Sequence, residues 1–282
     1  MPRIAPSTIR RAYRISPHAA TLLPATRDLS STLNELRWIR EYVQAQQQKQ
    51  QLEGPVRGSP TGTSAEHHVA ALCVDISPKA VRLARENVKY NVRRGLMPTP
   101  QPPRASVAFS QADIFSDALL DELEQLATAG GGGDSDPAWD VIVCNPPYVS
   151  HWGFAHQTAR GVRNYEPKIA QVPMVTYSGG GGGHEPEDVF YARLLDIGAR
   201  LGPRVMLFEV GDLKQALRVV EMALGHKGLG GSGVEVQAEV WRDWPDATPE
   251  EDEETSAMVC NGSREVQIRG GGHGRSVFIQ CR

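Results

Sequence analysis

The stretch VAALCVDISP, residues 69–78, decides the fold class of this 282-residue chain. Its first six residues form a short apolar run, which is typical of a strand buried on both faces in a parallel sheet. A helix is expected directly afterwards, because Ser77 is a good N-cap and Pro78 suits the first helical position. The stretch therefore predicts one strand–helix unit of an α/β sheet.

The same alternation of strands and amphipathic helices continues toward the C-terminus. After the first unit, the expected strands are 105–109, 141–144, 204–210, 234–241 and 276–280, and the expected helices are 116–126, 188–201 and 213–224. The last two strands are joined by a polar insert and are expected to pair as an antiparallel edge. This repeated alternation indicates an α/β sheet rather than separate helical and β domains.

The N-terminal part of the chain has a different character. Apolar residues recur at three- and four-residue steps between residues 29 and 51, which predicts one amphipathic helix with a Gln-rich end. Residues 54–66 are rich in Gly, Pro, Ser and Thr and show no apolar period. The predicted organisation is a helical segment over 1–53, a linker over 54–68 and an α/β domain over 69–282.

The first 27 residues contain five arginines and no acidic side chain, as in organelle transit peptides. A basic first helix of the folded protein is an equal alternative. The expected location is the mitochondrion, and otherwise the cytoplasm.

Composition excludes several function classes. A net charge of -3 and a pI near 6.3 argue against a general nucleic-acid binder, and no apolar run is long enough to cross a membrane. No metal site or disulfide framework is predicted, because the adjacent His67 and His68 have no partner ligands nearby and the cysteines are scattered. Those cysteines are Cys73, Cys144, Cys260 and Cys281.

The most specific motif is Asn145-Pro146-Pro147-Tyr148, directly after the strand at 141–144, which is predicted to be buried. Ligands of open α/β sheets bind at the carboxyl ends of strands, and consecutive prolines leave neighbouring carbonyls free to accept hydrogen bonds. An amide or an aromatic amine is a poor nucleophile, so methyl transfer to it needs acceptors that orient its N–H groups. Asn145 and the Pro146 carbonyl are the predicted acceptors. The alternative is a turn that only ends a strand.

The aromatic ring of Tyr148 adds to this interpretation. It could stack on a planar amide and also favour the positive charge of a sulfonium methyl donor. Catalysis of this kind rests on positioning and on acceptors directed at developing charge, so no metal and no covalent nucleophile are predicted.

Several carboxylates follow predicted strands or loops. Asp75 could accept hydrogen bonds from two ribose hydroxyls, and its alternative role is a cap at a helix N-terminus. Asp113 could meet an adenine amine, and its alternative role is a solvated turn. Glu166 could shape a substrate entrance, whereas Glu209 could be a cap or a structural hydrogen-bond acceptor.

Taken in order, five segments resemble the HemK-like release factor glutamine methyltransferases, and they are CVDISP (73–78), ADIF (112–115), NPPY (145–148), YEP (165–167) and FEVG (208–211). Residues 1–50 also resemble the helical part of fungal mitochondrial members. The resemblance implies a class I S-adenosylmethionine-dependent methyltransferase (Rossmann-like) sheet. It also implies a monomeric enzyme that methylates the glutamine of the Gly-Gly-Gln loop in class I peptide chain release factors.

The resemblance also implies residue roles. Asp75 would bind the ribose of S-adenosyl-L-methionine and Asp113 its adenine end. Asn145, where cofactor and substrate meet, would hold the substrate amide together with Pro146. Glu166 would lie near the substrate mouth.

Pro147 and Tyr148 complete the catalytic motif in this resemblance. Gln215 lies four residues after Gly211, a spacing that differs from the family pattern, so no role is carried over to it. Contact with nucleic acid is expected only through the release factor or the ribosome.

One departure from the family lies between Gln51 and Val69. A sheet of this type begins with a buried strand and a glycine-rich loop that approaches the methionine part of the cofactor. Here the glycines alternate with Pro55, Arg57 and Pro60, as in a linker. The domain is therefore predicted to lack its first strand and glycine loop, which would make the sheet incomplete.

Two alternatives to the leading function remain at this stage. The Asn-Pro-Pro-Tyr chemistry also suits the exocyclic amine of adenine, which would make the chain a nucleic-acid methyltransferase. The missing loop also allows an inactive, truncated homologue that still binds the release factor.

Overall fold

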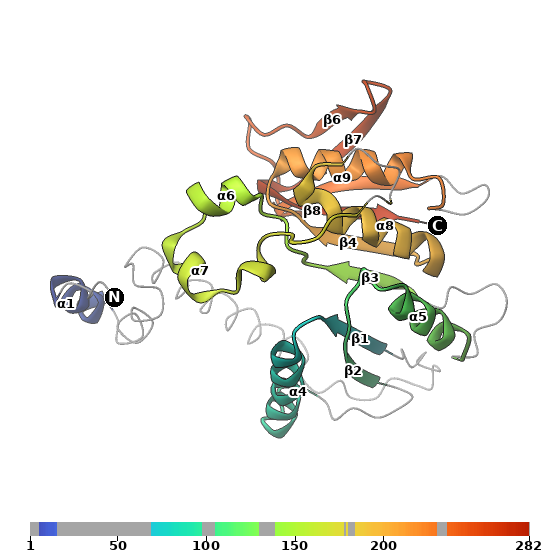
Figure 1. Ribbon diagram of the computed structural model, residues 1–282. Helices are drawn as coiled ribbons and strands as arrows, with labels where there is room; N and C mark the ends of the chain where they lie inside the picture. The colour runs from blue at the N-terminus through green and yellow to red at the C-terminus, as the bar shows by residue number, and fades with distance from the viewer. Residues whose placement is uncertain are drawn as a thin grey trace, which may run out of the picture. The chain divides into compact units, whose positions relative to one another are not determined.

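The computed structural model describes residues 6–15, 69–97, 105–129, 139–177, 179, 184–229 and 236–281 (Figure 1). The chain divides into two compact units, residues 1–67 and 68–282. Helix α1 (Pro6–Ile15) is the described part of the first unit. It carries arginines and no acidic residue in its first turn, which suits both a transit peptide and a basic first helix. The predicted helix at 29–51 and the linker at 54–68 lie outside the described residues.

Short strands and helices alternate through the second unit, as predicted. Its described strands are β1 (Val69–Asp75), β2 (Ala105–Gln111), β3 (Val141–Cys144), β4 (Val205–Glu209), β5 (Gln237–Trp244), β6 (Ser256–Val259), β7 (Arg264–Arg269) and β8 (Gly271–Gln280). Its described helices and 3₁₀ turns are α4 (Pro78–Arg93), α5 (Asp117–Ala129), α6 (His151–His156), α7 (Arg160–Tyr165), η1 (Lys168–Ala170), η2 (Pro186–Asp188), α8 (Val189–Leu201) and α9 (Leu213–Gly225).

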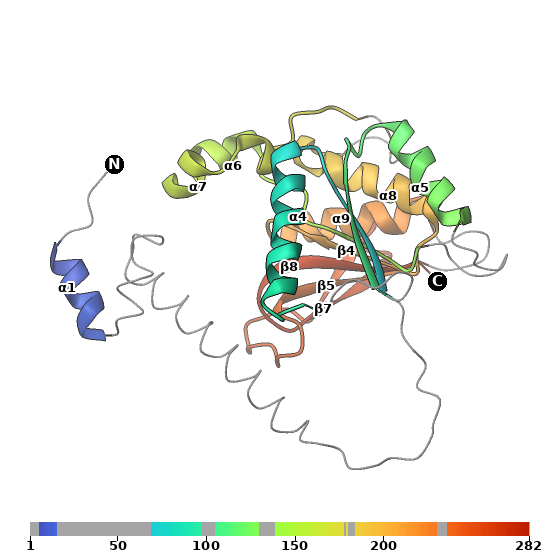
Figure 2. The same ribbon diagram turned by 90° about the horizontal axis from the view of Figure 1, so that it is seen from below.

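The first predicted strand–helix unit is confirmed. The Ser77 side chain accepts a hydrogen bond from the Ala80 amide at 3.3 Å, so Ser77 is the N-cap of α4 and Pro78 is its first residue. Figure 2 shows α4 on one side of the β1–β2 pair and α5 on the other. The sequence therefore sets the start of this helix through capping chemistry.

The strands form two sheets in the described part of the chain. β1 and β2 pair in parallel, and a larger sheet has the order β3-β4-β8-β5-β7-β6. β3 is parallel to β4, whereas β8 is antiparallel to both β4 and β5. The predicted antiparallel pairing of the strands near 234–241 and 276–280 is thus confirmed, but their position at the edge is wrong. β8 lies inside the sheet, because the unpredicted strands β6 and β7 extend it beyond β5.

The prediction that the strands at 69–74 and 141–144 are buried is wrong. Val141 and Val143 of β3 are 53% and 68% exposed, and Ala71 and Cys73 of β1 are exposed as well. Each strand pairs along one edge only among the described residues, and alternate side chains along each strand remain exposed. Both strands are therefore half-buried.

The main core lies between α8, α9 and the central strands β4, β8 and β5. Met206 and Phe208 of β4 are fully buried there, next to Tyr191 of α8 and Val219 of α9. A second cluster joins α5 to α8 and includes half-buried Leu72 of β1. The β1–β2 pair is therefore attached to the larger sheet through helix packing.

Arg193 strengthens this attachment. Its buried guanidinium donates to the backbone carbonyls of Ile114 at 2.7 Å and Ser116 at 3.3 Å, and to the Asp117 carboxylate at 3.0 Å. Phe115, in the same turn, packs edge-on against Phe190 of α8. The turn after β2 is thus fixed to α8.

Replacing Arg193 with leucine is expected to lower the free energy of unfolding by about 2–4 kcal/mol, because two backbone carbonyls lose their donor. Urea denaturation measures this loss. The matched control is Arg200→Leu on the same helix, whose ion pairs with Asp121 and Glu124 are solvent-exposed. The control is expected to cost at most about 1 kcal/mol. Equal losses in the two variants would contradict this assignment.

Candidate functional site

The Asn145–Tyr148 loop begins at the carboxyl end of β3, as predicted. Asn145 is exposed, and its side chain makes no hydrogen bond to any other described residue. No described N–H group donates to the carbonyl of the buried Pro146 either. The loop therefore offers an exposed amide side chain and a backbone carbonyl that has no donor among the described residues.

Tyr148 contacts the last residue of β4, the first turn of α9 and Gly211 between them. Its hydroxyl donates to Glu209 Oε1 at 3.0 Å, and its carbonyl accepts from Gln215 Nε2 at 3.2 Å. Its ring packs on Gly211, where an added Cβ would lie 3.2 Å from Tyr148 Cδ2. A larger residue at 211 would have to displace the ring, which explains a glycine at this close approach.

The environment of Tyr148 keeps its phenol protonated. Burial, the hydrogen bond to Glu209 and the nearby negative charge of Glu166 raise the pKa of Tyr148 to about 12. Burial also raises the pKa of the neighbouring Cys144 thiol to about 12. At neutral pH the site therefore presents a neutral aromatic hydroxyl and no thiolate nucleophile.

Tyr148 is expected to ionise near pH 12. Its pKa is higher in the folded than in the unfolded chain, so its contribution to stability is complete below about pH 10 and is lost as the pH rises toward 12. NMR of ζ-carbon-labelled tyrosine, assigned with Tyr148→Phe, measures this pKa. Glu209→Gln should move the midpoint toward pH 10, and a wild-type midpoint near 10 would contradict the geometry.

Glu166 lies close enough to Tyr148 for its charge to act on the phenol. It ends α7, and its carboxylate accepts from Gln171 Nε2 at 2.5 Å. The Gln171 carbonyl in turn accepts from the Val149 amide at 2.8 Å, directly after the loop. Glu166 and the loop are therefore parts of one site.

A cavity of about 270 Å³ adjoins this site between Val149 and Glu187. Met174, which lines this cavity, is exposed, and so are Trp152, Tyr165 and Ile169, which lie in the chain between the lining residues His151 and Val172.

Asp75 and Asp113 lie at the carboxyl ends of β1 and β2, and so they meet at one edge of the smaller sheet. Asp75 Oδ1 accepts from the Ser77 amide at 2.7 Å, and Asp113 Oδ1 accepts from the Phe115 amide at 3.0 Å. The second carboxylate oxygen of each residue accepts no hydrogen bond from the part of the chain that the structure describes. Asp75 thus holds the amide of Ser77, and Ser77 rather than Asp75 is the N-cap of α4. Asn145, by contrast, follows a strand of the larger sheet.

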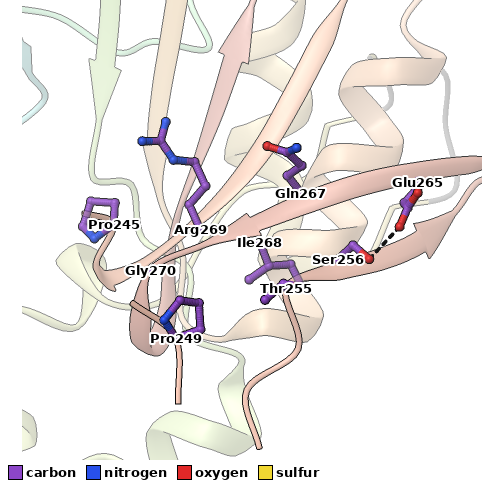
Figure 3. A pocket seen from close by; sticks show the side chains of 9 residues that line it. All are labelled: Pro245, Pro249, Thr255, Ser256, Glu265, Gln267, Ile268, Arg269 and Gly270. Carbon is purple, nitrogen blue, oxygen red and sulfur yellow. Dashed lines mark hydrogen bonds between the residues drawn. The ribbon is translucent and has the colours of Figure 1, made fainter. Parts of the chain in front are cut away.

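A larger cavity of about 610 Å³ lies on the hairpin of β6 and β7 (Figure 3). It contains none of the predicted site residues. Its charged side chains have partners, because Ser256 donates to Glu265 and Arg269 pairs with Glu239. This cavity is open and is not part of the candidate site.

No role was predicted for Gln215, Asp188 or Arg218, although Gln215 contacts the loop and Asp188 joins Gln215 to Arg218. Gln215 and Asp188 are buried, and they are hydrogen-bonded to each other at 2.9 Å. The available signal was a glutamine among the apolar positions of α9, where a buried amide needs specific partners.

Two further expectations concern metals and membranes. His67 and His68 lie outside the described residues. Among those that are described, no group of His, Cys, Asp and Glu is arranged to hold a metal ion. In the same part of the chain, no helix has the length and apolar character needed to cross a bilayer.

Comparison with known proteins gives one informative relative. No protein-family model matches the chain. Over 145 residues it is 29% identical to a Schizosaccharomyces pombe protein described as "Probable MRF1 mitochondrial N(5)-glutamine methyltransferase mtq1". The match covers 51% of this chain and 40% of the relative, so the chain spans less than half the length of that protein. This relative confirms the resemblance drawn from the motifs, and its mitochondrial description agrees with the expected location.

Proposed function

We propose, because the chain resembles the HemK-like release factor glutamine methyltransferases of fungal mitochondria, that it methylates the side-chain amide of a glutamine. The methyl donor is S-adenosyl-L-methionine, and the substrate is the Gly-Gly-Gln loop of a class I peptide chain release factor in the mitochondrion. This proposal rests on the motifs, on the fission-yeast relative and on the free acceptors of the reaction loop.

The observation that carries the proposal is the unengaged side chain of Asn145 beside the Pro146 carbonyl. These two oxygens accept the N–H groups of the substrate amide and so direct its nitrogen at the methyl group. S-adenosylmethionine supplies an electrophilic methyl on a sulfonium. With the donor bound, the carbon–sulfur bond of the sulfonium would break as the C–N bond forms, and the electron pair would remain on sulfur in S-adenosylhomocysteine. The amide nitrogen would lose one proton to solvent, and the acceptors on its N–H groups would stabilise that change.

Tyr148 contributes an uncharged aromatic ring to the site. Its hydroxyl donates a hydrogen bond to Glu209, and this bond fixes the position of the ring at the end of the loop. A planar amide can stack on such a ring, and a nearby cation is attracted to its face.

The described residues fit one part of the cofactor. Asp75 and Asp113 offer carboxylate oxygens at neighbouring strand ends, which suits ribose hydroxyls and an adenine amine. None of them is arranged as a glycine loop for the methionine part. The unpaired edges of β1 and β3 are compatible with an absent strand, and we propose that residues 69–282 form a domain that lacks this strand and loop.

A second candidate is an inactive homologue that binds the release factor without methylating it. In an active enzyme the cofactor would contact the carboxyl ends of β1, β2 and β3. Because these strands belong to two different sheets, their arrangement favours the inactive homologue. Binding of the cofactor separates the two functions.

Calorimetric titration of the chain with S-adenosylmethionine tests the proposed enzyme. We expect weak binding, with a Kd on the order of 1 mM, that is lost in Asp75→Ala. Asp252→Ala, in the exposed acidic run, is the control and should bind like the wild type. Absence of binding at millimolar cofactor would favour the inactive homologue.

A further inference from the structure

Three polar side chains form a network behind the reaction loop. Asp188 is fully buried and Gln215 is 4% exposed. Arg218 donates to both Asp188 oxygens, from Nε at 2.5 Å and from Nη2 at 2.9 Å. Burial of such groups is costly unless each is paired, so the arrangement has to serve a specific contact.

Every hydrogen-bonding position of the Gln215 amide except one acceptor position is used. Its Oε1 accepts from the Gly211 amide at 2.8 Å, and its Nε2 donates to Asp188 Oδ1 at 2.9 Å and to the Tyr148 carbonyl at 3.2 Å. An ionised carboxylate is an acceptor only, so Asp188 fixes which end of the amide carries the donors. The second Nε2 proton is thereby directed at the Tyr148 carbonyl.

We infer that Gln215 is a positioning residue for the Asn145–Tyr148 loop, oriented by Asp188 and Arg218. Its effect on catalysis rests on the proposed function, whereas its effect on the loop does not. Glu209 holds the hydroxyl of Tyr148 and Gln215 holds its carbonyl, so the end of β4 and the first turn of α9 fix this residue at both ends.

This arrangement determines where the two free acceptors lie. Pro146 and Pro147 make the loop stiff, and a fixed Tyr148 therefore also restricts Asn145, three residues earlier. Preorganised acceptors matter because small displacements of reacting groups cause large losses of rate. Gln215 acts on the reaction through Tyr148 and does not touch the substrate.

The test uses Gln215→Glu, an isosteric change that keeps an acceptor for Gly211 and removes the donor to Tyr148. Amide hydrogen exchange of residues 145–152 in the full chain is expected to become about 10-fold faster, as for the loss of one hydrogen bond. The NMR signal of labelled Tyr148 is expected to shift. Gln237→Glu, the same change at an exposed position of β5, should leave both readouts unchanged.

A double variant, Asp188→Asn with Gln215→Glu, separates loop positioning from general stability. The new asparagine amide can donate to the new glutamate, so the buried pair is restored with reversed polarity, but the Tyr148 carbonyl still lacks its donor. We expect a melting temperature above that of Gln215→Glu, with loop exchange still fast. The double variant decides the question if the single variant does not fold.

Wild-type loop exchange in either variant would overturn the inference. So would exchange that increases equally in the loop, β4 and α9, since that pattern indicates a purely structural role. Neither readout requires cofactor binding or methyl transfer, so a failure of the proposed function would leave this test intact.

Discussion

Insertion of a strand, a glycine loop and a helix between residues 53 and 69 is expected to stabilise the protein by several kcal/mol, at about 25 cal/mol per Å² of apolar surface buried. The same insertion is expected to tighten binding of S-adenosylmethionine from about 1 mM to about 1 μM.

The physical reason lies in β1 and β3. Each has one unpaired edge among the described residues, and each exposes alternate side chains on one face. On β3 these are Val141 and Val143, whose register partners on β4 are Val205 and Leu207. An added strand could form hydrogen bonds with the unpaired edges of β1 and β3. A strand parallel to β1 has to be joined to it by a crossover, usually a helix, and that helix could cover the exposed side chains.

The control insertion has the same length and loop, with its core-facing residues changed to serine and asparagine. It is expected to give neither the gain in stability nor the tighter binding. Urea denaturation and calorimetry measure the two effects. A stabilised chain that still binds the cofactor weakly would show that the carboxyl ends of β1 and β3 do not form the cofactor site.

Replacing Asn145 with alanine in the strand-inserted chain is expected to lower the rate of methyl transfer by about 100-fold or more, as for the loss of one preorganised polar group in other active sites. Stability should change little, because the Asn145 side chain is exposed and makes no hydrogen bond to another described residue. The loss should therefore appear in the rate of transfer, with the fold intact.

The matched control for this variant is Asn87→Ala, at an exposed position of α4. It should retain the full rate. Asn145→Asp keeps an oxygen acceptor but adds a charge and removes the amide donor, so an intermediate rate is expected. A rate for Asn145→Ala within a few-fold of the control would contradict the role given to the loop.

Local chemistry made much of the fold predictable. The N-cap at Ser77 gave the start of α4, and the apolar runs gave β1 to β4 to within a few residues. The hairpin of β6 and β7 was missed because its buried residues, such as Val266 and Ile268, alternate with charged ones beside an acidic run. Helices α6 and α7 have six residues each, which is too short for a helical period to show.

The burial of β1 and β3 was the main error in the predicted fold. An apolar run predicts a strand, but whether both faces are covered depends on neighbours that sequence periodicity does not identify. Among the described residues β3 has a neighbour along one edge only, and Val143 is mostly exposed.

The sequence motif of the candidate site could be predicted, but the residues that hold the motif in place could not. Asn145 and Tyr148 follow from the residue types after a strand. The partners of Tyr148 are Glu209 and Gln215, which are 61 and 67 residues away along the chain. Such contacts depend on the packing of β3 beside β4, and a motif does not specify that packing.

Methyl transfer from labelled S-adenosylmethionine tests the central claim most directly. The chain and its strand-inserted form are each incubated with a class I release factor, with the same factor whose Gly-Gly-Gln glutamine is replaced, and with DNA. We predict label on the intact release factor alone, at the side-chain amide of that glutamine. Label on DNA, label that persists without the glutamine, or no transfer by either form would contradict the claim.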